Sequence, residues 1–335
     1  MAVLKIGVAG TGRMGINHIE RIHERVADAK VYAIASGNIS NAEKAAGKYD
    51  IPNVCDSGES MIETGIDAMI VASSGASHES YVRACIKAGI PVFCEKPLSD
   101  TKDGCIRLME LEAKSGKQLI QVGFMRHFDT YHNELKEAVS KRELGEPLIV
   151  HAVHRNPTAA NFDDRMQIMD AAIHMIDVIP WILGGDKFVS CNVVCGKSTP
   201  LVNGKYKDPQ IIIFETESGV IVEFEIFTNC QYGFDTSCEV VCERGTISLP
   251  QSTAALIKVP SHRQISEYSQ WHIRHSNAFD KEIWHFIDGV RKGVITGPTA
   301  WEAYAASEVG EACLESLKAG GKREINYIGQ PELYR

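Results

Sequence analysis

The stretch Gly10-Thr11-Gly12-Arg13-Met14-Gly15 decides the fold of the first part of the chain. It follows an apolar run at 3–9 and opens an amphipathic stretch, so the glycines lie at a predicted strand-to-helix turn. In that context the pattern G-x-G-x-x-G predicts a dinucleotide-binding βαβ unit. Gly10 permits the tight turn, Gly12 lets a pyrophosphate approach the backbone, and Gly15 lets helix and strand pack closely. The N-terminus of the helix adds free N–H groups and a partial positive charge for phosphates.

The alternation of strand and helix continues beyond this stretch. Amphipathic segments at 77–88 and 102–115 end near Gly89 and Gly116, and glycine just past the last helical residue is a helix stop signal. Between the helices lie short, continuous apolar runs of the kind that form strands buried on both faces of a parallel sheet. These runs are at 31–35, 68–72, 91–94 and 119–122. We therefore predict a doubly wound parallel Rossmann sheet, and assign residues 1–122 to an NAD(P)-binding domain.

The chain from 123 to 335 has a different pattern. The run at 220–226 alternates partly between apolar and charged residues, which indicates a sheet with one less buried face. We predict an α+β C-terminal domain with a large, mostly antiparallel, open-faced sheet, which serves substrate binding and oligomerisation. Its predicted strands are at 148–154, 211–216, 220–226, 238–242 and 246–249, and its predicted helices are at 166–183, 273–290 and 299–317.

Composition excludes several classes of protein. The 335 residues are 44% hydrophobic and 23% charged, which is typical of a soluble globular protein. With 35 Lys and Arg against 43 Asp and Glu, the net charge of −8 argues against a nucleic-acid partner. We find no apolar stretch near the roughly 18 residues that span a bilayer and no secretion signal. The ten cysteines form no Cys-x-x-Cys pair, so we expect reduced thiols and a cytoplasmic location.

The residues after the run at 31–35 bear on the choice of cofactor. An acidic residue at this point holds the ribose hydroxyls of NAD, whereas an Arg accommodates the extra phosphate of NADP. The sequence has Ser36-Gly37-Asn38 here, so neither signal is present. Because a serine hydroxyl can bond either group, these residues leave the choice open.

Two further motifs carry the candidate chemistry. Glu95-Lys96-Pro97 follows the predicted strand at 91–94, at the sheet edge where ligands bind, so Lys96 can reach a group reacting at a nicotinamide. Asp170, His174 and Asp177 have the spacing i, i+4 and i+7 in an otherwise apolar helix, so they share one stripe. A carboxylate beside a histidine raises its basicity, which suits removal of a hydroxyl proton.

Alternative interpretations of these motifs remain open. Lys96 could be a surface residue in a turn, and His174 could be a core histidine with satisfied hydrogen bonds. A metal site with His151, His154 and His174 is a third possibility, although we predict no metal.

Together these motifs, in this order and spacing, resemble the glucose–fructose oxidoreductase / inositol dehydrogenase / rhizopine catabolism (Gfo/Idh/MocA) family over essentially the whole chain. Within it the chain is most similar to the branch of bacterial inositol 2-dehydrogenases. The closer signals are the stretches at 121–129, 154–158 and 170–177. Two departures are Gly75, where proline is common before a cofactor-lining His78, and Ser36-Gly37, where inositol dehydrogenases that use NAD usually carry Asp.

The resemblance implies an NAD(P)-dependent inositol dehydrogenase that oxidises the 2-hydroxyl of myo-inositol to a ketone, with a role in inositol catabolism and carbohydrate metabolism. His174 would take the hydroxyl proton, Asp170 would orient His174, and Lys96 would bond the reacting oxygen. NAD is the expected cofactor, with NADP as an alternative, and a homotetramer packed through the sheet is the expected assembly. The implied ligands of the other hydroxyls are Arg126, His154, Asn156, Asp177 and Tyr232. The candidate cofactor-binding residues are Gly10, Thr11, Gly12, Arg13, Met14, Ser36, Gly37, Ser73, Ser74, His78, Glu95 and Lys96.

Other functions stay open from the sequence. A family oxidoreductase could act on scyllo-inositol, another inositol isomer or an aldose, and it could use NADP. A sensor that binds NAD(P) without turnover and a metal-dependent sugar isomerase or hydrolase are more distant alternatives. The physiological direction of the reaction is also open.

Overall fold

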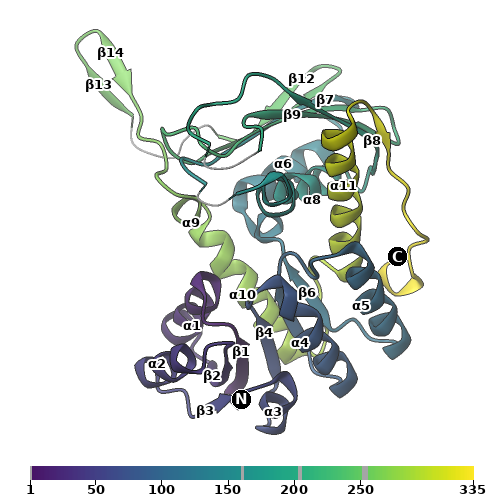
Figure 1. The fold of residues 1–335 in the computed structure, drawn as a ribbon. Coiled ribbons are helices and arrows are strands. Elements are labelled where there is room, and N and C mark those ends of the chain that lie inside the picture. The colour runs from purple at the N-terminus through teal and green to yellow at the C-terminus, as the bar shows by residue number, and fades with distance from the viewer. Residues whose placement is uncertain (1, 160–161, 203–205, 251–255) are drawn as a thin grey trace. The chain divides into compact units, whose positions relative to one another are not determined.

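The computed structural model describes residues 2–159, 162–202, 206–250 and 256–335. Its backbone contacts divide the chain into two compact units (Figure 1). The first unit comprises Met1–Met125, Phe279–Ala305 and Ile328–Arg335, and the second comprises Arg126–Ala278 and Ala306–Tyr327.

The first unit is built on a six-stranded sheet with the order β3-β2-β1-β4-β5-β6, and every strand pair in it is parallel. This is the predicted doubly wound sheet, although the short outer strand β3 was missed by the sequence pattern. Its strands are β1 (Leu4–Ala9), β2 (Ala29–Ala35), β3 (Asn53–Cys55), β4 (Ala68–Val71), β5 (Val92–Glu95) and β6 (Ile120–Gly123). Its helices are α1 (Arg13–Arg25), α2 (Ile39–Tyr49), α3 (Gly58–Glu63), α4 (Gly75–Ala88) and α5 (Lys102–Ser115), with a C-terminal 3-10 turn at Glu332–Tyr334.

Successive side chains along β1 point to opposite faces of the sheet, and different helices cover the two faces. Ile6 and Val8 are buried in a cluster with apolar residues of α1, α2 and α10 (Ser276–Lys292). Gly7 points to the opposite face, where a Cβ atom would lie 2.4 Å from the sulfur of Met61 in α3. Helices therefore cover both faces of the sheet, which explains why its strands are continuous apolar runs.

Helix ends in this unit follow the glycine signals. Gly89 and Gly116 lie just after α4 and α5 with φ of 69° and 70°, in the left-handed region that glycine adopts readily. At the other end of α5, the Thr101 side chain accepts a hydrogen bond from the Gly104 amide at 3.1 Å. The two predicted helix stops are confirmed.

The division into units differs from the single boundary expected after residue 122. The N-terminal segment of the first unit ends at Met125, and the unit also includes Phe279–Ala305 and Ile328–Arg335. The physical reason is the apolar face of α10, whose Ile283, Phe286 and Ile287 belong to the core of the first sheet. A buried helix face far along the chain was not visible in the local sequence pattern.

The second unit is built on a seven-stranded sheet with the order β12-β11-β7-β10-β9-β8-β15. Only β7 and β10 pair in parallel; the other pairs are antiparallel, as predicted. Its strands are β7 (Pro147–Arg155), β8 (Phe188–Cys195), β9 (Gln210–Thr216), β10 (Ile221–Phe227), β11 (Asp235–Cys242), β12 (Gly245–Ser248) and β15 (Arg323–Glu324). A separate hairpin consists of β13 (Ile257–Val259) and β14 (His262–Gln264).

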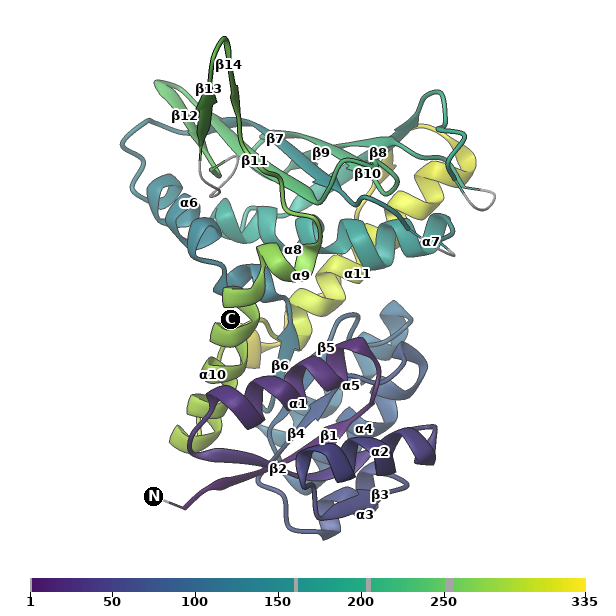
Figure 2. The same ribbon diagram turned by 90° about the vertical axis from the view of Figure 1, so that its left-hand side faces the viewer.

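Helices cover one face of this sheet (Figure 2). The helix predicted at 166–183 consists of a short turn, a π-helical segment that contains Asp170, and an α-helix, α8. Such π-helical turns occur often at functional sites. The helices are α6 (Thr130–Ser140), α7 (Asp164–Met166), the π-helical η2 (Gln167–Ala172), α8 (Ile173–Ile182), α9 (Trp271–Arg274) and the later part of α11 (Ala300–Ala319), with a 3-10 turn, η1, at Met125–Phe128.

The other face of the sheet carries exposed side chains. Apolar residues from four strands are among them: Val194, Ile211, Ile221 and Ile149 are 37–49% exposed. The hairpin of β13 and β14 projects on the same side (Figure 2). Within the described residues, no helix has the length and apolar character needed to cross a bilayer.

We predict that Phe286→Ala destabilises the first unit by about 3–5 kcal/mol, because it removes a fully buried ring and leaves a cavity. The ring packs in the sheet core, with its centroid 5.9 Å from that of Phe93. Trp284→Ala on the same helix is the matched control, since that side chain is 46% exposed and its loss should cost less than about 1 kcal/mol. Urea unfolding of both variants measures the difference, and equal destabilisation would contradict this account of the core.

Candidate active site

The glycine loop brings three backbone segments together at the end of β1. Gly10 has φ of 113°, and a Cβ atom on it would lie 2.3 Å from the carbonyl oxygen of Ala72. A Cβ atom on Gly15 would lie 2.1 Å from the carbonyl oxygen of Gly10. At Gly12, just before α1, a Cβ atom would meet nothing within 4 Å, so the space in front of the helix N-terminus is open. This loop therefore has the shape that a dinucleotide pyrophosphate requires.

Ser36 lies directly after β2, beside the glycine loop. The hydroxyl oxygens of Thr11 and Ser36 are 2.8 Å apart, and the Asn38 amide donates to the Ser36 hydroxyl at 3.3 Å. The Asn38 side chain in turn accepts from the Ser40 amide and caps α2. The hydroxyl of Ser36 is thus held where dinucleotide-binding folds recognise the adenosine ribose.

The loop after β4 is tied to the loop after β5. The ring nitrogens of His78, which is buried in α4, lie 2.8 Å from the Pro97 carbonyl oxygen and 3.1 Å from that of Ser73. The Ser77 hydroxyl also donates to the Ser73 hydroxyl at 2.7 Å, and Ser74 precedes α4 as its N-cap. His78 therefore lies between the two loops, where a ring N–H can donate to either carbonyl oxygen. Cofactor contact by Ser73, Ser74 and His78 stays a prediction.

Glu95 and Lys96 lie at the carboxyl end of β5, as expected. Glu95 is buried, and its Oε1 accepts a hydrogen bond from Nε2 of His18 in α1 at 2.8 Å. Lys96 is half-buried. A Cβ atom on Gly123 of the neighbouring strand would lie 3.0 Å from Oε2 of Glu95, so the carboxylate is closely enclosed.

A second buried carboxyl group lies in the same unit. Glu282 in α10 is fully buried, and neither of its carboxyl oxygens has a hydrogen-bond partner among the described residues. Burial, reinforced by the negative charge of Glu95 and opposed by Arg21, raises the pKa of Glu282 well above its usual value. The structure therefore favours the protonated form of this carboxyl group over the charged one.

Arg126 and His154 form the centre of a polar cluster in the second unit. Both side chains are buried on the helix-covered side of the sheet, and Nη2 of Arg126 donates to Nδ1 of His154 at 2.9 Å. Because a guanidinium has no acceptor, Nδ1 of His154 is unprotonated and its proton is on Nε2. Asp177 of α8 is also buried, and its Oδ2 accepts from Nε2 of His127 at 2.9 Å.

The three residues of the predicted helical stripe differ in exposure. Asp170 in the π-helical segment is exposed, His174 in the first turn of α8 is half-buried, and Asp177 is buried. The stripe therefore runs from the surface into the unit. This gradient suits a base that must be reached by a substrate and also held by the protein.

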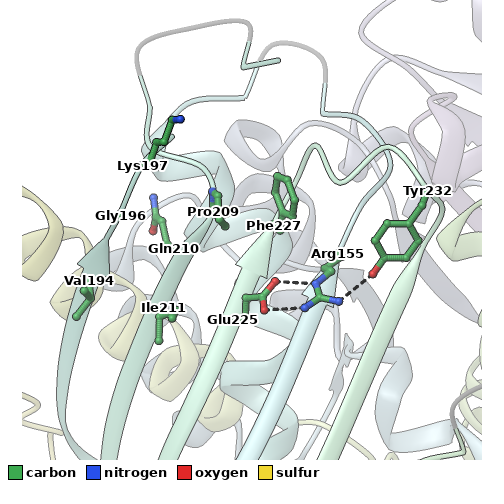
Figure 3. Close-up of a pocket in the computed structure, with 10 residues that line it drawn as sticks. All are labelled: Arg155, Val194, Gly196, Lys197, Pro209, Gln210, Ile211, Glu225, Phe227 and Tyr232. Atoms are coloured by element: carbon green, nitrogen blue, oxygen red, sulfur yellow. Dashed lines mark hydrogen bonds and ion pairs between the residues drawn. The ribbon is translucent and has the colours of Figure 1, made fainter. Parts of the chain in front are cut away.

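Asn156 and Tyr232 lie apart from the buried pair. Asn156 follows β7 and is half-buried, with its backbone bonded to Phe227 and Cys230. Tyr232 is 51% exposed; its hydroxyl accepts from Arg155 at 2.9 Å and lies within hydrogen-bond distance of Asp235. Tyr232, Arg155 and Glu225 line a hollow of about 530 Å³ on the open face of the sheet. Figure 3 shows the Arg155 side chain bonded to both Glu225 and Tyr232. The structure does not bring Tyr232 to Arg126, so its role as a substrate ligand stays a prediction.

Sequence reasoning missed several residues around Arg126. Asp129, His132, Arg274 and His275 form a buried polar cluster in this unit. Asp129 lies only three positions after Arg126 and could have been noticed, but Arg274 and His275 are about 145 positions further on and no local pattern points to them. Across the described ranges, no group of three or more His, Cys, Asp or Glu side chains is arranged to hold a metal ion.

A Rossmann sheet with an open glycine loop at its first helix, and a lysine at the carboxyl end of β5, is typical of nicotinamide-dependent oxidoreductases. The chain belongs to the Gfo/Idh/MocA family: residues 4–124 match its NAD-binding Rossmann fold and residues 136–325 match its C-terminal alpha/beta domain. The predicted family, fold class and NAD-dependent oxidoreductase class are therefore confirmed.

Individual relatives agree with this assignment. An inositol 2-dehydrogenase of Acidiphilium cryptum is 42% identical over 99% of both chains, and one of Burkholderia cenocepacia is 39% identical over the same share. The structure of myo-inositol dehydrogenase from Lactobacillus casei in complex with NAD(H) and myo-inositol superposes with a TM-score of 0.96. It is 32% identical, and the match covers 99% of this chain and 100% of that one.

We predict that the stability of Glu282→Gln relative to the wild type rises with pH. The wild-type acid has a folded-state pKa raised above its unfolded value, so its contribution is fully present below pH about 4.5 and is lost as pH rises toward the folded pKa. Urea unfolding at pH 5 and pH 8 should show the wild type losing free energy of unfolding relative to the variant. Glu110→Gln, which alters an exposed residue of α5, is the control and should keep a constant difference. Parallel pH slopes for wild type and Glu282→Gln would contradict the buried acid.

Proposed function

We propose that this protein is an NAD-dependent inositol 2-dehydrogenase that oxidises the 2-hydroxyl of myo-inositol to the ketone. The observation that carries the proposal is the full-length match to the L. casei enzyme, whose structure contains both NAD(H) and myo-inositol. The curated relatives at about 40% identity over the whole chain support the same activity.

The residues proposed to bind NAD lie around the open end of the first sheet. The amides after Gly12 would face the pyrophosphate, with Thr11 of the loop and with Arg13 and Met14 of the first turn of α1 beside it. Ser36 and Gly37 would lie at the adenosine ribose, where the open space and the held hydroxyl fit the group. Ser73, Ser74, His78 and Glu95 would line the nicotinamide half.

In the proposed mechanism His174 takes the proton of the reacting hydroxyl, and Asp170 raises the basicity of His174 and orients its ring. Lys96 donates a hydrogen bond to the same oxygen and stabilises the negative charge that develops there. NAD, when bound, supplies the hydride acceptor. His174 and Lys96 therefore act on the reacting hydroxyl directly, and Asp170 acts through His174.

The remaining hydroxyls of the ring need both donors and acceptors. Arg126 and the Nε2–H of His154 supply donors, and Asp177, oriented by His127, supplies an acceptor. Asn156 and Tyr232 complete the proposed set, and the Tyr232 hydroxyl is bonded to Arg155 in this structure. A site rich in such groups discriminates strongly between hydroxyl configurations, because a mismatched isomer leaves buried polar groups unpaired.

We further propose that the protein acts in the cytoplasm as a homotetramer. The open face of the second sheet supports self-association, since its Val194, Ile211, Ile221 and Ile149 form a broad, partly apolar surface. Sedimentation velocity should give about four times the chain mass of 36.9 kDa. Ile211→Lys should lower the assembled fraction at micromolar concentration, and a wild-type chain that sediments as a monomer would contradict the assembly.

The test of the activity is a panel of initial rates with myo-inositol, scyllo-inositol, D-chiro-inositol and D-glucose, each with NAD and with NADP. We expect the highest rate with myo-inositol and NAD. A rate with another polyol alone, or with NADP alone, would place the enzyme in a neighbouring branch of the family. No turnover with any polyol, despite binding of NAD, would favour a sensor.

Variants link the rate to the proposed residues. His174→Ala should lower kcat by about 100- to 10,000-fold, because it removes the general base, and Lys96→Ala should lower it about 100-fold or more. His262→Ala, an exposed histidine on the β13–β14 hairpin, is the matched control and should keep the wild-type rate. Full activity in His174→Ala would overturn the mechanism.

A further inference from the structure

A buried ion pair lies beside the Arg126–His154 pair in the second unit. It joins Asp129, which precedes α6, to Arg274, the last residue of α9. Nη1 of Arg274 donates to Oδ1 of Asp129 at 2.9 Å, and Nη2 donates to Oδ2 at 3.3 Å. Both side chains are no more than 7% exposed, so water screens this pair little.

The Asp129 carboxylate also organises its own helix. Its Oδ2 accepts from Nδ1 of His132 at 2.6 Å and from the His132 amide at 3.3 Å. Against the opposing effect of burial, the bonds from His132 and Arg274 hold the pKa of Asp129 well below its usual range. Asp129 is thus a fixed negative charge with both oxygens bound.

Two routes connect this pair indirectly to the proposed substrate ligands. The first is one turn of 3-10 helix, in which the Asp129 amide donates to the Arg126 carbonyl at 3.2 Å. The second is a row of rings: His275, next to Arg274, packs edge-on against Phe234 at 5.6 Å, and Phe234 packs edge-on against His154 at 5.5 Å. A displacement of Asp129 would therefore be transmitted to Arg126, and a displacement of Arg274 would be transmitted to His154.

The charges around Arg126 explain why the carboxylate matters. Burial lowers the pKa of Arg126 to about 10; the negative charge of Asp129 opposes this fall, whereas the positive charge of Arg274 adds to it. Asp177 and Cys238 also act on Arg126. Burial lowers the pKa of His132 to about 4 and that of His275 further below its usual value, so both rings are neutral at pH 7. Without Asp129, the two buried guanidinium groups would lose the negative charge that most strongly offsets their mutual repulsion at Arg126.

We propose that the Asp129–Arg274 ion pair is a positioning device for polyol recognition, in which Asp129 balances two buried guanidinium groups and thereby holds Arg126 and His154 in place for substrate hydroxyls. Asp129 and Arg274 are positioning residues: they act through Arg126 and do not touch the substrate. The inference rests on the proposed function, because it takes Arg126 and His154 as ligands of the polyol.

The alternative is that the pair only fastens α9 to α6. The two roles predict different effects when both charges of the pair are removed together. If balance of charge matters, Asp129→Asn leaves two opposed cations, and adding Arg274→Gln relieves the repulsion. If fastening alone matters, the second substitution removes a further contact and cannot help.

The experiment measures kcat, KM for myo-inositol and KM for NAD in the full chain. Asp129→Asn should raise KM for myo-inositol about 10-fold or more and leave KM for NAD within about twofold. The double variant Asp129→Asn/Arg274→Gln should recover a KM for myo-inositol several-fold lower than that of Asp129→Asn alone. Glu215→Gln, which breaks the exposed pair with Lys322, is the matched control and should change neither KM.

Each outcome decides between the two roles. An unchanged KM for myo-inositol in Asp129→Asn, or a double variant no better than the single one, overturns the positioning role. If Asp129→Asn does not fold, as shown by thermal unfolding, Arg274→Lys and Arg274→Gln replace it: the variant that keeps the charge should keep KM nearer the wild-type value, and equal values overturn the inference. A wild-type chain without turnover on any polyol overturns the proposed function itself, whereas an active wild type with an unaffected Asp129→Asn overturns only the positioning role.

Discussion

The close approach of backbone at Gly10 is the constraint on which the first unit depends. β1 ends between β2 and β4, and the strand order changes direction there, so the chain must turn sharply into α1 at the point where a ligand can enter. The contact with the Ala72 carbonyl leaves no room for a side chain on Gly10, and the contact with Gly10 leaves none on Gly15. The position of α1, and with it the site for phosphates, follows from these two close contacts.

Each unit buries ionisable groups next to the residues proposed to do chemistry. In the first, Glu95 accepts a hydrogen bond from His18, and its negative charge adds to the raised pKa of buried Glu282. In the second, Asp129 and Arg274 lie beside Arg126. Burying a charge costs free energy unless the charge is compensated, so the burial of these groups does not by itself stabilise the fold. Their shared feature is that each fixes the surroundings of a side chain that must hold one orientation.

Side chains on the strands of the second sheet alternate between two faces, and each face forms a different surface. On β7, His154 points to the covered side and joins Arg126, whereas its neighbour Arg155 points to the open side and joins Glu225. The same strand therefore contributes to a proposed substrate site and to a proposed subunit interface. Because side chains alternate with a period of two, a shift in register by one residue would exchange these surfaces.

The sequence by itself determined the class of fold, the glycine loop, both helix stops and the candidate residues Lys96 and His174, because each depends on local geometry or short spacing. Periodicity identifies buried strands and helix faces, and glycine is required wherever φ is positive or two backbones touch. The tertiary structure alone decided that α10 belongs to the first core, that Tyr232 lies with Arg155, and that Asp129 pairs with Arg274. These contacts join residues up to hundreds of positions apart, and long-range packing and charge pairing leave no periodic signal in a single chain.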